Sequence, residues 1–297
     1  MKVLLTGVRG QVGCELERAL QPVGEVIALD RSALDLANGQ SVRQALLLHR
    51  PQWVVNPAAY TQVDQAEDDE AGARAVNAEG VKTMAATCAE IGATLVHYST
   101  DYVFDGEKEG PYDEDDRPNP IGVYGRTKLQ GEEAVRASRC AHVVIRTSWV
   151  FSARGRNFLK TILRLAVERD ELRIVDDQRG APTSARFIAE ATAAVVWKAA
   201  SVPALAARLR AGETLNVCSA GATSWFGFAE YAIEHASLSR RPRLVPIPSS
   251  AYPTKARRPR NSALSLDRLH AVWGIAAPAW QVATAQCLRE LAEAQSR

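Results

Sequence analysis

The sequence predicts an α/β protein: a Rossmann-type, doubly wound parallel sheet with a smaller C-terminal α/β lobe. Short apolar runs of strand length alternate with helical stretches, and a glycine-rich turn follows the first run. Strands that alternate with helices of this length are typical of βαβ units in a parallel sheet. A polar, turn-rich segment at 176–183 follows this regular alternation of strands and helices. We therefore expect residues 1–170, together with 184–200, to form the sheet domain, and 171–297 to form mainly the smaller lobe.

Hydrophobic spacing predicts each element in turn. Val3-Leu4-Leu5, closed by Thr6-Gly7, is typical of a buried strand that enters a turn. Similar short apolar runs predict strands at 26–29, 53–55, 94–98, 142–146 and 214–218. Apolar residues three and four apart predict helices at 11–20, 42–48, 69–91, 121–136, 157–168, 185–198, 225–236 and 280–294.

Composition excludes several classes of protein. Of the 297 residues, 46% are apolar and 24% charged, which is typical of a globular protein, and a net charge of +2 argues against a nucleic-acid surface. The five cysteines form no CxxC pair, so we expect no disulfide framework. This cysteine pattern fits a protein of the reducing cytoplasm. The N-terminal apolar run is too short for a signal peptide, and no run of 18 apolar residues predicts a membrane span.

The turn after the first strand has the pattern G-x-x-G-x-x-G, formed by Gly7, Gly10 and Gly13 with Gln11 and Val12 between them. Glycines at a helix N-terminus let a pyrophosphate approach the free amides, so residues 1–170 are predicted to bind NAD(P); the alternative is a purely structural turn.

The residues after the second strand bear on the choice of coenzyme. Asp30 at the strand end suits the ribose hydroxyl of NADH, whereas Arg31 suits the 2′-phosphate of NADPH, so the coenzyme stays open. Asp35-Leu36 could contact the adenine or form an ordinary turn.

A second motif, Tyr124-x-x-x-Lys128, lies on a predicted helix, where residues four apart share a face. A lysine near the phenol favours its anion and can also hold the nicotinamide ribose. By itself the motif occurs by chance, but here it follows Ser99-Thr100-Asp101-Tyr102 at a predicted carboxyl strand end, where α/β sheets bind ligands. The hydroxyl of Thr100 can then hydrogen-bond a carbonyl that Tyr124 protonates.

These motifs resemble the extended short-chain dehydrogenase/reductases, and among them the dTDP-4-dehydrorhamnose reductase family. The resemblance extends over nearly the whole chain and is carried by the glycine turn, by S-T-D-Y-V-F-D-G at 99–106, by the tyrosine and lysine motif, and by segments at 58–67, 146–150, 177–183 and 258–262. It implies that the C4 keto group of dTDP-4-dehydro-L-rhamnose is reduced to give dTDP-L-rhamnose for cell-surface polysaccharide.

The same resemblance assigns site residues. Thr100, Tyr124 and Lys128 would be catalytic. The coenzyme would contact the glycine turn, Asp30, Arg31, Asp35, Leu36, Ala58, Ala59, Tyr60, Tyr124 and Lys128. The sugar nucleotide would contact Val63, Thr100, Asp101, Tyr102, Tyr124 and Trp149. Core packing is the alternative for Trp149 and the expectation for Trp225. Arg258, in a basic loop, would bind the substrate diphosphate, the alternative being a solvated face.

Two residues depart from the family pattern. Pro57 stands where alanine is usual and removes one amide near the coenzyme. Some relatives are cation-bridged dimers. Glu15 could join such a carboxylate cluster, but Arg186 stands where another carboxylate is expected, so no metal is predicted and a homodimer stays open.

The alternative functions are a non-catalytic NADP-binding regulatory subunit and a reductase or epimerase acting on another nucleotide sugar.

Overall fold

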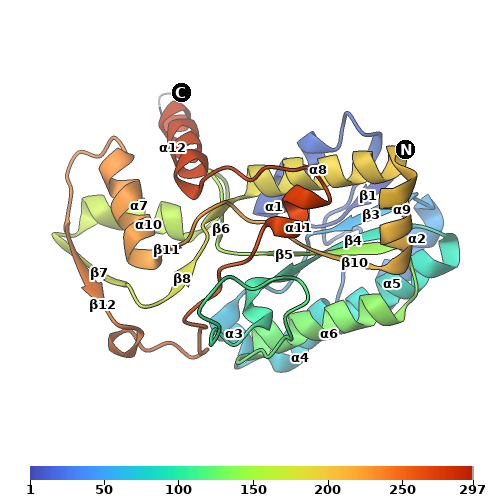
Figure 1. Cartoon of the computed structure of the whole chain (residues 1–297), viewed down its shortest axis with the longest axis horizontal. Helices are drawn as coiled ribbons and strands as arrows, with labels where there is room; N and C mark the ends of the chain where they lie inside the picture. Colours follow the sequence, from blue (N-terminus) through green and yellow to red (C-terminus); the bar gives the residue numbers. More distant parts are fainter. Residues whose placement is uncertain (296–297) are drawn as a thin grey trace.

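A six-stranded parallel sheet forms the centre of the computed structural model, which describes residues 1–295 (Figure 1). Its strands in spatial order are β2 (Glu25–Ala28), β1 (Lys2–Leu5), β3 (Trp53–Asn56), β4 (Thr94–Thr100), β5 (His142–Thr147) and β10 (Glu213–Asn216). Every neighbouring pair is parallel. The predicted doubly wound parallel sheet is therefore confirmed.

Helices cover both faces of this sheet. They are α1 (Gln11–Ala19) and α8 (Ala185–Ser201) on one face, and α2 (Gly39–His49), α5 (Gly80–Ile91) and α6 (Val123–Ala137) on the other. Alternate strand residues point to opposite faces: Val3 and Leu5 belong to the core under α1 and α8, whereas Leu4 belongs to the core under α2 and α5. A fully buried side chain of this kind contributes about 1.5–3 kcal/mol to folding.

The order of the strands creates a crevice at one edge of the sheet. From β1 the chain moves outward to β2 and then returns to β3 on the other side of β1. Ligands of open α/β sheets bind at the carboxyl ends of the strands where the winding direction changes in this way. The crevice between β1 and β3 is therefore the expected binding edge.

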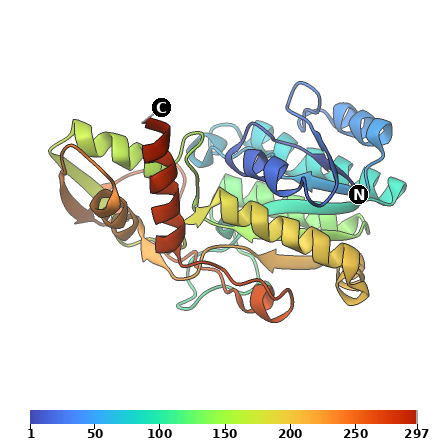
Figure 2. The same cartoon turned by 90° about the horizontal axis from the view of Figure 1, so that it is seen from above.

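A smaller lobe lies at one end of the molecule, beside the large sheet (Figures 1 and 2). Its elements are α7 (Phe158–Glu168), β7 (Glu171–Val175), β8 (Arg179–Gly180), β11 (Thr223–Ser224), α10 (Trp225–His235), β12 (Arg243–Ile247) and α12 (Trp280–Gln295). Strands β7 and β12 pair in parallel, and Ile162, Leu172 and Ile233 share a core between them and the helices. The lobe is thus itself α/β.

The chain crosses between the two parts more often than the sequence pattern predicted. Helix α7 packs in the smaller lobe, although residues up to 170 were assigned to the sheet domain. Conversely, α9 (Pro203–Ala211), β10 and α11 (Asp267–Ala271) pack at the edge of the large sheet, although 171–297 was assigned mainly to the lobe. Hydrophobic spacing reports the type of an element and not the sheet that it joins, which explains both differences.

Several short elements connect these parts. The helix expected at 69–91 consists of α4 (Glu70–Arg74), a π-helical turn η1 (Ala75–Glu79) and α5. The remaining ones are α3 (Val63–Ala66), η2 (Asp101–Val103), β6 (Val150–Phe151), β9 (Thr183–Ser184) and η3 (Ser249–Ala251). Within the described part of the chain, no single helix has the length and apolarity to cross a membrane; α8 and α9 meet that test only as a pair bent by 108°.

Candidate active site

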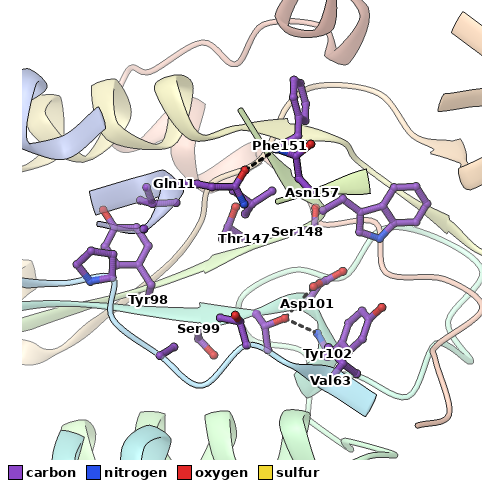
Figure 3. Close-up of a pocket in the computed structure, with 18 of the residues that line it drawn as sticks. Gln11, Val63, Tyr98, Ser99, Asp101, Tyr102, Thr147, Ser148, Phe151 and Asn157 are labelled. Atoms are coloured by element: carbon purple, nitrogen blue, oxygen red, sulfur yellow. Dashed lines mark hydrogen bonds between the residues drawn. The ribbon is translucent and has the colours of Figure 1, made fainter. Parts of the chain in front are cut away.

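A cleft of about 640 Å³ opens at the carboxyl ends of β1, β3, β4 and β5 (Figure 3). It brings together many of the residues that the sequence singled out. Those lining it are Gly7, Gly10, Gln11, Val12, Gly13, Ala58, Ala59, Val63, Thr100, Asp101, Tyr102, Tyr124, Lys128 and Trp149. Pro57 also lines the cleft, so the position that departs from the family pattern lies in the site.

The glycine turn fits a diphosphate. Gly7 has a φ of +60°, and a Cβ at Gly13 would come within 2.1 Å of the carbonyl oxygen of Gly7, so both positions require glycine. The N-cap of α1, Gly10, offers no side chain to its first amides, and the first turn holds no acidic residue. Free amides at the positive end of a helix attract a diphosphate group.

Thr100, Tyr124 and Lys128 meet at the end of β4. Thr100 Oγ1 accepts the backbone N–H of Tyr102 at 3.2 Å, donates to Asp101 Oδ1 at 2.9 Å, and lies within hydrogen-bond reach of the Tyr124 phenol. The ammonium of Lys128 is buried and donates to the carbonyl oxygen of Tyr98 at 2.5 Å. Helix α6 thus presents the phenol and the ammonium from one face toward the strand end.

Burial sets the protonation states at this corner. It raises the pKa of Tyr124 to about 12, with Thr100 opposing the shift, so the phenol keeps its proton at neutral pH. Burial lowers the pKa of Lys128 to about 8, against the pull of the Glu132 carboxylate, so most of the lysine is still charged at pH 7. The pKa of the phenol is therefore raised and not lowered as the tyrosine and lysine motif predicted, because burial is the largest effect on it.

Asp101 contributes a buried carboxyl group beside Thr100 at the end of β4. Burial raises its pKa to about 7, against hydrogen bonds from Ser262 and Thr100. Tyr102, the next residue, packs edge-on against Tyr124 with ring centroids 6.0 Å apart. These side chains wall the space in front of the phenol.

Two tryptophans stack at the cleft. The indoles of Trp149 and Trp225 have centroids 3.5 Å apart and planes within 5°, and both line the cleft. Trp225 was expected in the core. It packs against the core of the smaller lobe and also lines the cleft, because it stands at the start of α10. No sequence signal distinguished it, since a tryptophan at helical spacing is more often packed in a core.

Ser152 and Asn157 were also missed. Gln11 Oε1 accepts from Ser152 Oγ at 3.1 Å and from Asn157 Nδ2 at 2.8 Å, which ties the segment between β6 and α7 to the glycine turn. An asparagine just before a helix signals an N-cap, and Asn157 does accept from Lys160 N. That signal gave no hint of the cleft.

The other predicted site residues lie outside the cleft lining. Asp30 accepts from Ser32 and pairs with Arg9; these hydrogen bonds, chiefly those from Ser32, lower its pKa. Arg31 is exposed and lies 3.4 Å from Asp35. Leu36 is buried in the core under α2 and α5.

Tyr60 and Arg258 are held by neighbours. The backbone of Tyr60 bonds the Asn77 amide. The guanidinium of Arg258 was expected to bind a diphosphate. It instead donates hydrogen bonds to both carboxylate oxygens of Asp64, from Nη2 to Oδ2 at 2.7 Å and from Nη1 to Oδ1 at 3.2 Å, and lies beside Tyr102.

A cation site is not evident at Glu15. Arg186 Nη1 lies 2.6 Å from Glu290 Oε1, and its Nε lies 3.9 Å from Glu15 Oε2. Residues 1–295 hold no group of three or more His, Cys, Asp or Glu side chains that could bind a metal ion.

Known proteins match this chain over almost its whole length. The family model described as RmlD substrate binding domain matches residues 1–293. A dTDP-4-dehydrorhamnose reductase of Burkholderia thailandensis is 47% identical, with 98% of this chain and 99% of that protein aligned. The corresponding Escherichia coli K12 protein is 40% identical, with 98% of each covered. The crystal structure of a Bacillus anthracis dTDP-4-dehydrorhamnose reductase in complex with NADP superposes with a TM-score of 0.87 at 32% identity, covering 97% of this chain and 99% of that one.

Proposed function

The chain belongs to the RmlD substrate binding domain family, and we propose that it catalyses the NAD(P)H-dependent reduction of the C4 keto group of dTDP-4-dehydro-L-rhamnose to give dTDP-L-rhamnose. Two relatives with 47% and 40% identity carry the name of that reductase. The observation that carries the proposal is the meeting of Thr100, Tyr124 and Lys128 in the same cleft as the glycine turn. A module that only binds a nucleotide has no need of all three side chains.

The residues present fit a nicotinamide dinucleotide. The glycine turn leaves room and free amides for a diphosphate, and a structural relative was crystallised with NADP. When bound, the coenzyme supplies the hydride for the reduction. Lys128 is buried, charged at neutral pH and part of the cleft lining, which supports a role as hydrogen-bond donor to a ribose hydroxyl. Ala58 and Ala59 line the same wall without adding bulk or charge.

The proton of the reduction comes from the protein. The pKa of Tyr124 is about 12, so the phenol keeps its proton at neutral pH. It can release this proton to a carbonyl oxygen that gains negative charge during the reaction. Thr100, within hydrogen-bond reach of the phenol, orients that oxygen toward it. Tyr102 and Trp149 line the same cleft, which supports contact of their rings with a deoxysugar.

We place the protein in the cytoplasm. All five cysteines are free thiols, four of them buried, which suits a reducing compartment. The nucleotide-linked substrate and the coenzyme are also metabolites of that compartment.

The deciding experiment mixes the purified full-length protein with dTDP-4-dehydro-L-rhamnose and follows NADPH by its near-ultraviolet absorbance. Consumption of NADPH with formation of dTDP-L-rhamnose is expected, and the Tyr124→Phe variant is the matched control. If the protein binds NADPH but reduces no sugar nucleotide, it is a regulatory subunit. If it turns over another nucleotide sugar instead, the substrate assignment is wrong.

A further inference from the structure

The segment from Ser152 to Asn157 forms a loop that is tied down over the glycine turn. Besides the two bonds to Gln11, Asn157 Nδ2 donates to the Ser152 carbonyl at 2.7 Å. Gly155 adopts a φ of +67°, and a Cβ there would lie 3.2 Å from Gln11 Cγ. Figure 3 shows Gln11 and Asn157 reaching toward each other at the wall of the cleft. The loop is therefore fixed on the side where a diphosphate is expected.

Two arginines flank this glycine, and they differ in position. Arg154 and Arg156 are both exposed, and neither forms an ion pair with any side chain in the described part of the chain. Arg156 lines the cleft, whereas Arg154 lies outside its lining. A free guanidinium at the wall of a ligand cleft, on a loop held by hydrogen bonds, is placed to bind an anion.

The surrounding backbone carries the same sign of charge. Helices α1 and α7 begin at Gln11 and Phe158, so both N-termini reach this loop and are joined through the bond from Asn157 to Gln11. The α7 cap bonds Lys160 N, and the first turn of α7 holds no acidic residue. Helix N-termini carry partial positive charge, so the guanidinium of Arg156 adds to a field already favourable to phosphate.

We propose that Arg156 binds a diphosphate group at this end of the cleft. The inference rests on the proposed function, which brings two molecules with that group, the coenzyme and the nucleotide sugar. A guanidinium can form two parallel hydrogen bonds to phosphate oxygens, which an ammonium cannot match. The guanidinium of Arg258, which the sequence assigned to the substrate diphosphate, is engaged by Asp64.

The test measures binding without turnover. Calorimetry would give the dissociation constants of NADP⁺ and of dTDP for the wild type, Arg156→Ala, Arg156→Lys and the matched control Arg154→Ala. We expect Arg156→Ala to weaken at least one nucleotide about tenfold at low salt, Arg156→Lys to recover part of that loss, and Arg154→Ala to stay within about twofold. Loss of NADP⁺ affinity alone assigns the coenzyme diphosphate, and loss of dTDP affinity alone assigns the substrate diphosphate.

Either of two results would overturn the proposal: unchanged affinity for both nucleotides in Arg156→Ala, or an equal loss in Arg154→Ala, which would reduce the effect to general surface charge. Failure of the function itself is distinct. It would show as a wild type that binds NADP⁺ yet reduces no nucleotide sugar, while the Arg156 comparison with NADP⁺ still gives an answer.

Discussion

The indole of Trp149 lies flat on that of Trp225, with ring centroids 3.5 Å apart. Trp149 follows β5 of the large sheet and Trp225 opens α10 of the smaller lobe, so the stack joins the two parts at the cleft. The backbone of Trp149 has a φ of +44°, a conformation that costs about 1–3 kcal/mol in a residue other than glycine. Trp225 is itself anchored by a hydrogen bond from Nε1 to Gln178 Oε1 at 3.2 Å.

Removing the Trp225 indole should therefore loosen the position of Trp149 in the cleft wall. In Trp225→Ala we expect the Michaelis constant for the nucleotide sugar to rise about two- to tenfold, because aromatic pairs are worth about 0.5–1.5 kcal/mol. NADP⁺ affinity should stay unchanged. Steady-state kinetics and calorimetry measure the two effects. Trp197→Ala, which removes a tryptophan that is 57% exposed on α8, is the control. Equal kinetic constants in Trp225→Ala and wild type would show that the stack does not support the substrate.

Tyr124→Phe tests the proton donor. The change keeps the ring against Tyr102 but removes the proton, so turnover should fall by about 10²–10⁴-fold while NADPH still binds at the untouched glycine turn. Single-turnover kinetics and a separate NADPH titration measure the two properties. Thr100→Val, nearly isosteric, should cost less, because it removes a hydrogen bond and no proton. Wild-type turnover in Tyr124→Phe would refute the assignment.

Much of the large sheet could be predicted from the sequence because its strands are apolar on both faces. Runs such as Val3-Leu4-Leu5 and Trp53-Val54-Val55 need no alternation of polar and apolar residues when helices cover both sides. The two-residue strands β6, β8, β9 and β11 carry no such signal. Strands β7 and β12 lie 72 positions apart at Leu172 and Leu244, so no local pattern predicts their pairing.

The candidate site likewise contains residues that local sequence patterns reveal and residues that only the tertiary fold brings together. The glycine turn and the tyrosine and lysine motif are local patterns with a direct chemical reason, and the structure brings them into one cleft. Trp225 and Arg156 reach that cleft only because the smaller lobe folds against the sheet domain. The engagement of Arg258 by Asp64 joins residues 194 positions apart and was equally invisible to spacing.

Coenzyme selectivity should be loose. Asp30 and Arg31 lie side by side after β2, one suited to a ribose hydroxyl and the other, largely exposed, to a 2′-phosphate. We expect the kcat/KM values for NADH and NADPH to differ by less than about a hundredfold, or roughly 3 kcal/mol. Arg31→Ala should lower the value for NADPH and leave NADH unaffected. A larger native preference in either direction would mean that one of the two side chains does not face the coenzyme.

Coenzyme affinity should depend on pH through Lys128. Burial lowers the pKa of this lysine to about 8, so the free enzyme holds the ammonium at pH 7 and loses it above pH 8. If the ammonium donates to the ribose, coenzyme binding favours the protonated form and raises that pKa. Affinity for NADP⁺ should therefore be nearly constant from about pH 7 to pH 8. It should then fall as pH rises further, by at most about tenfold per pH unit.

Lys128→Met separates this effect from other titrations. Methionine fills a similar buried volume without a charge, so its NADP⁺ affinity should be weaker than wild type at pH 7 and should not fall across the same pH range. Calorimetry at a series of pH values measures both proteins. The comparison also distinguishes the lysine from Asp101, whose pKa of about 7 places its titration lower and whose carboxyl remains in the variant. A wild-type affinity that stays constant up to pH 9.5, or a variant that keeps the same decline above pH 8, would mean that the Lys128 ammonium does not hold the coenzyme.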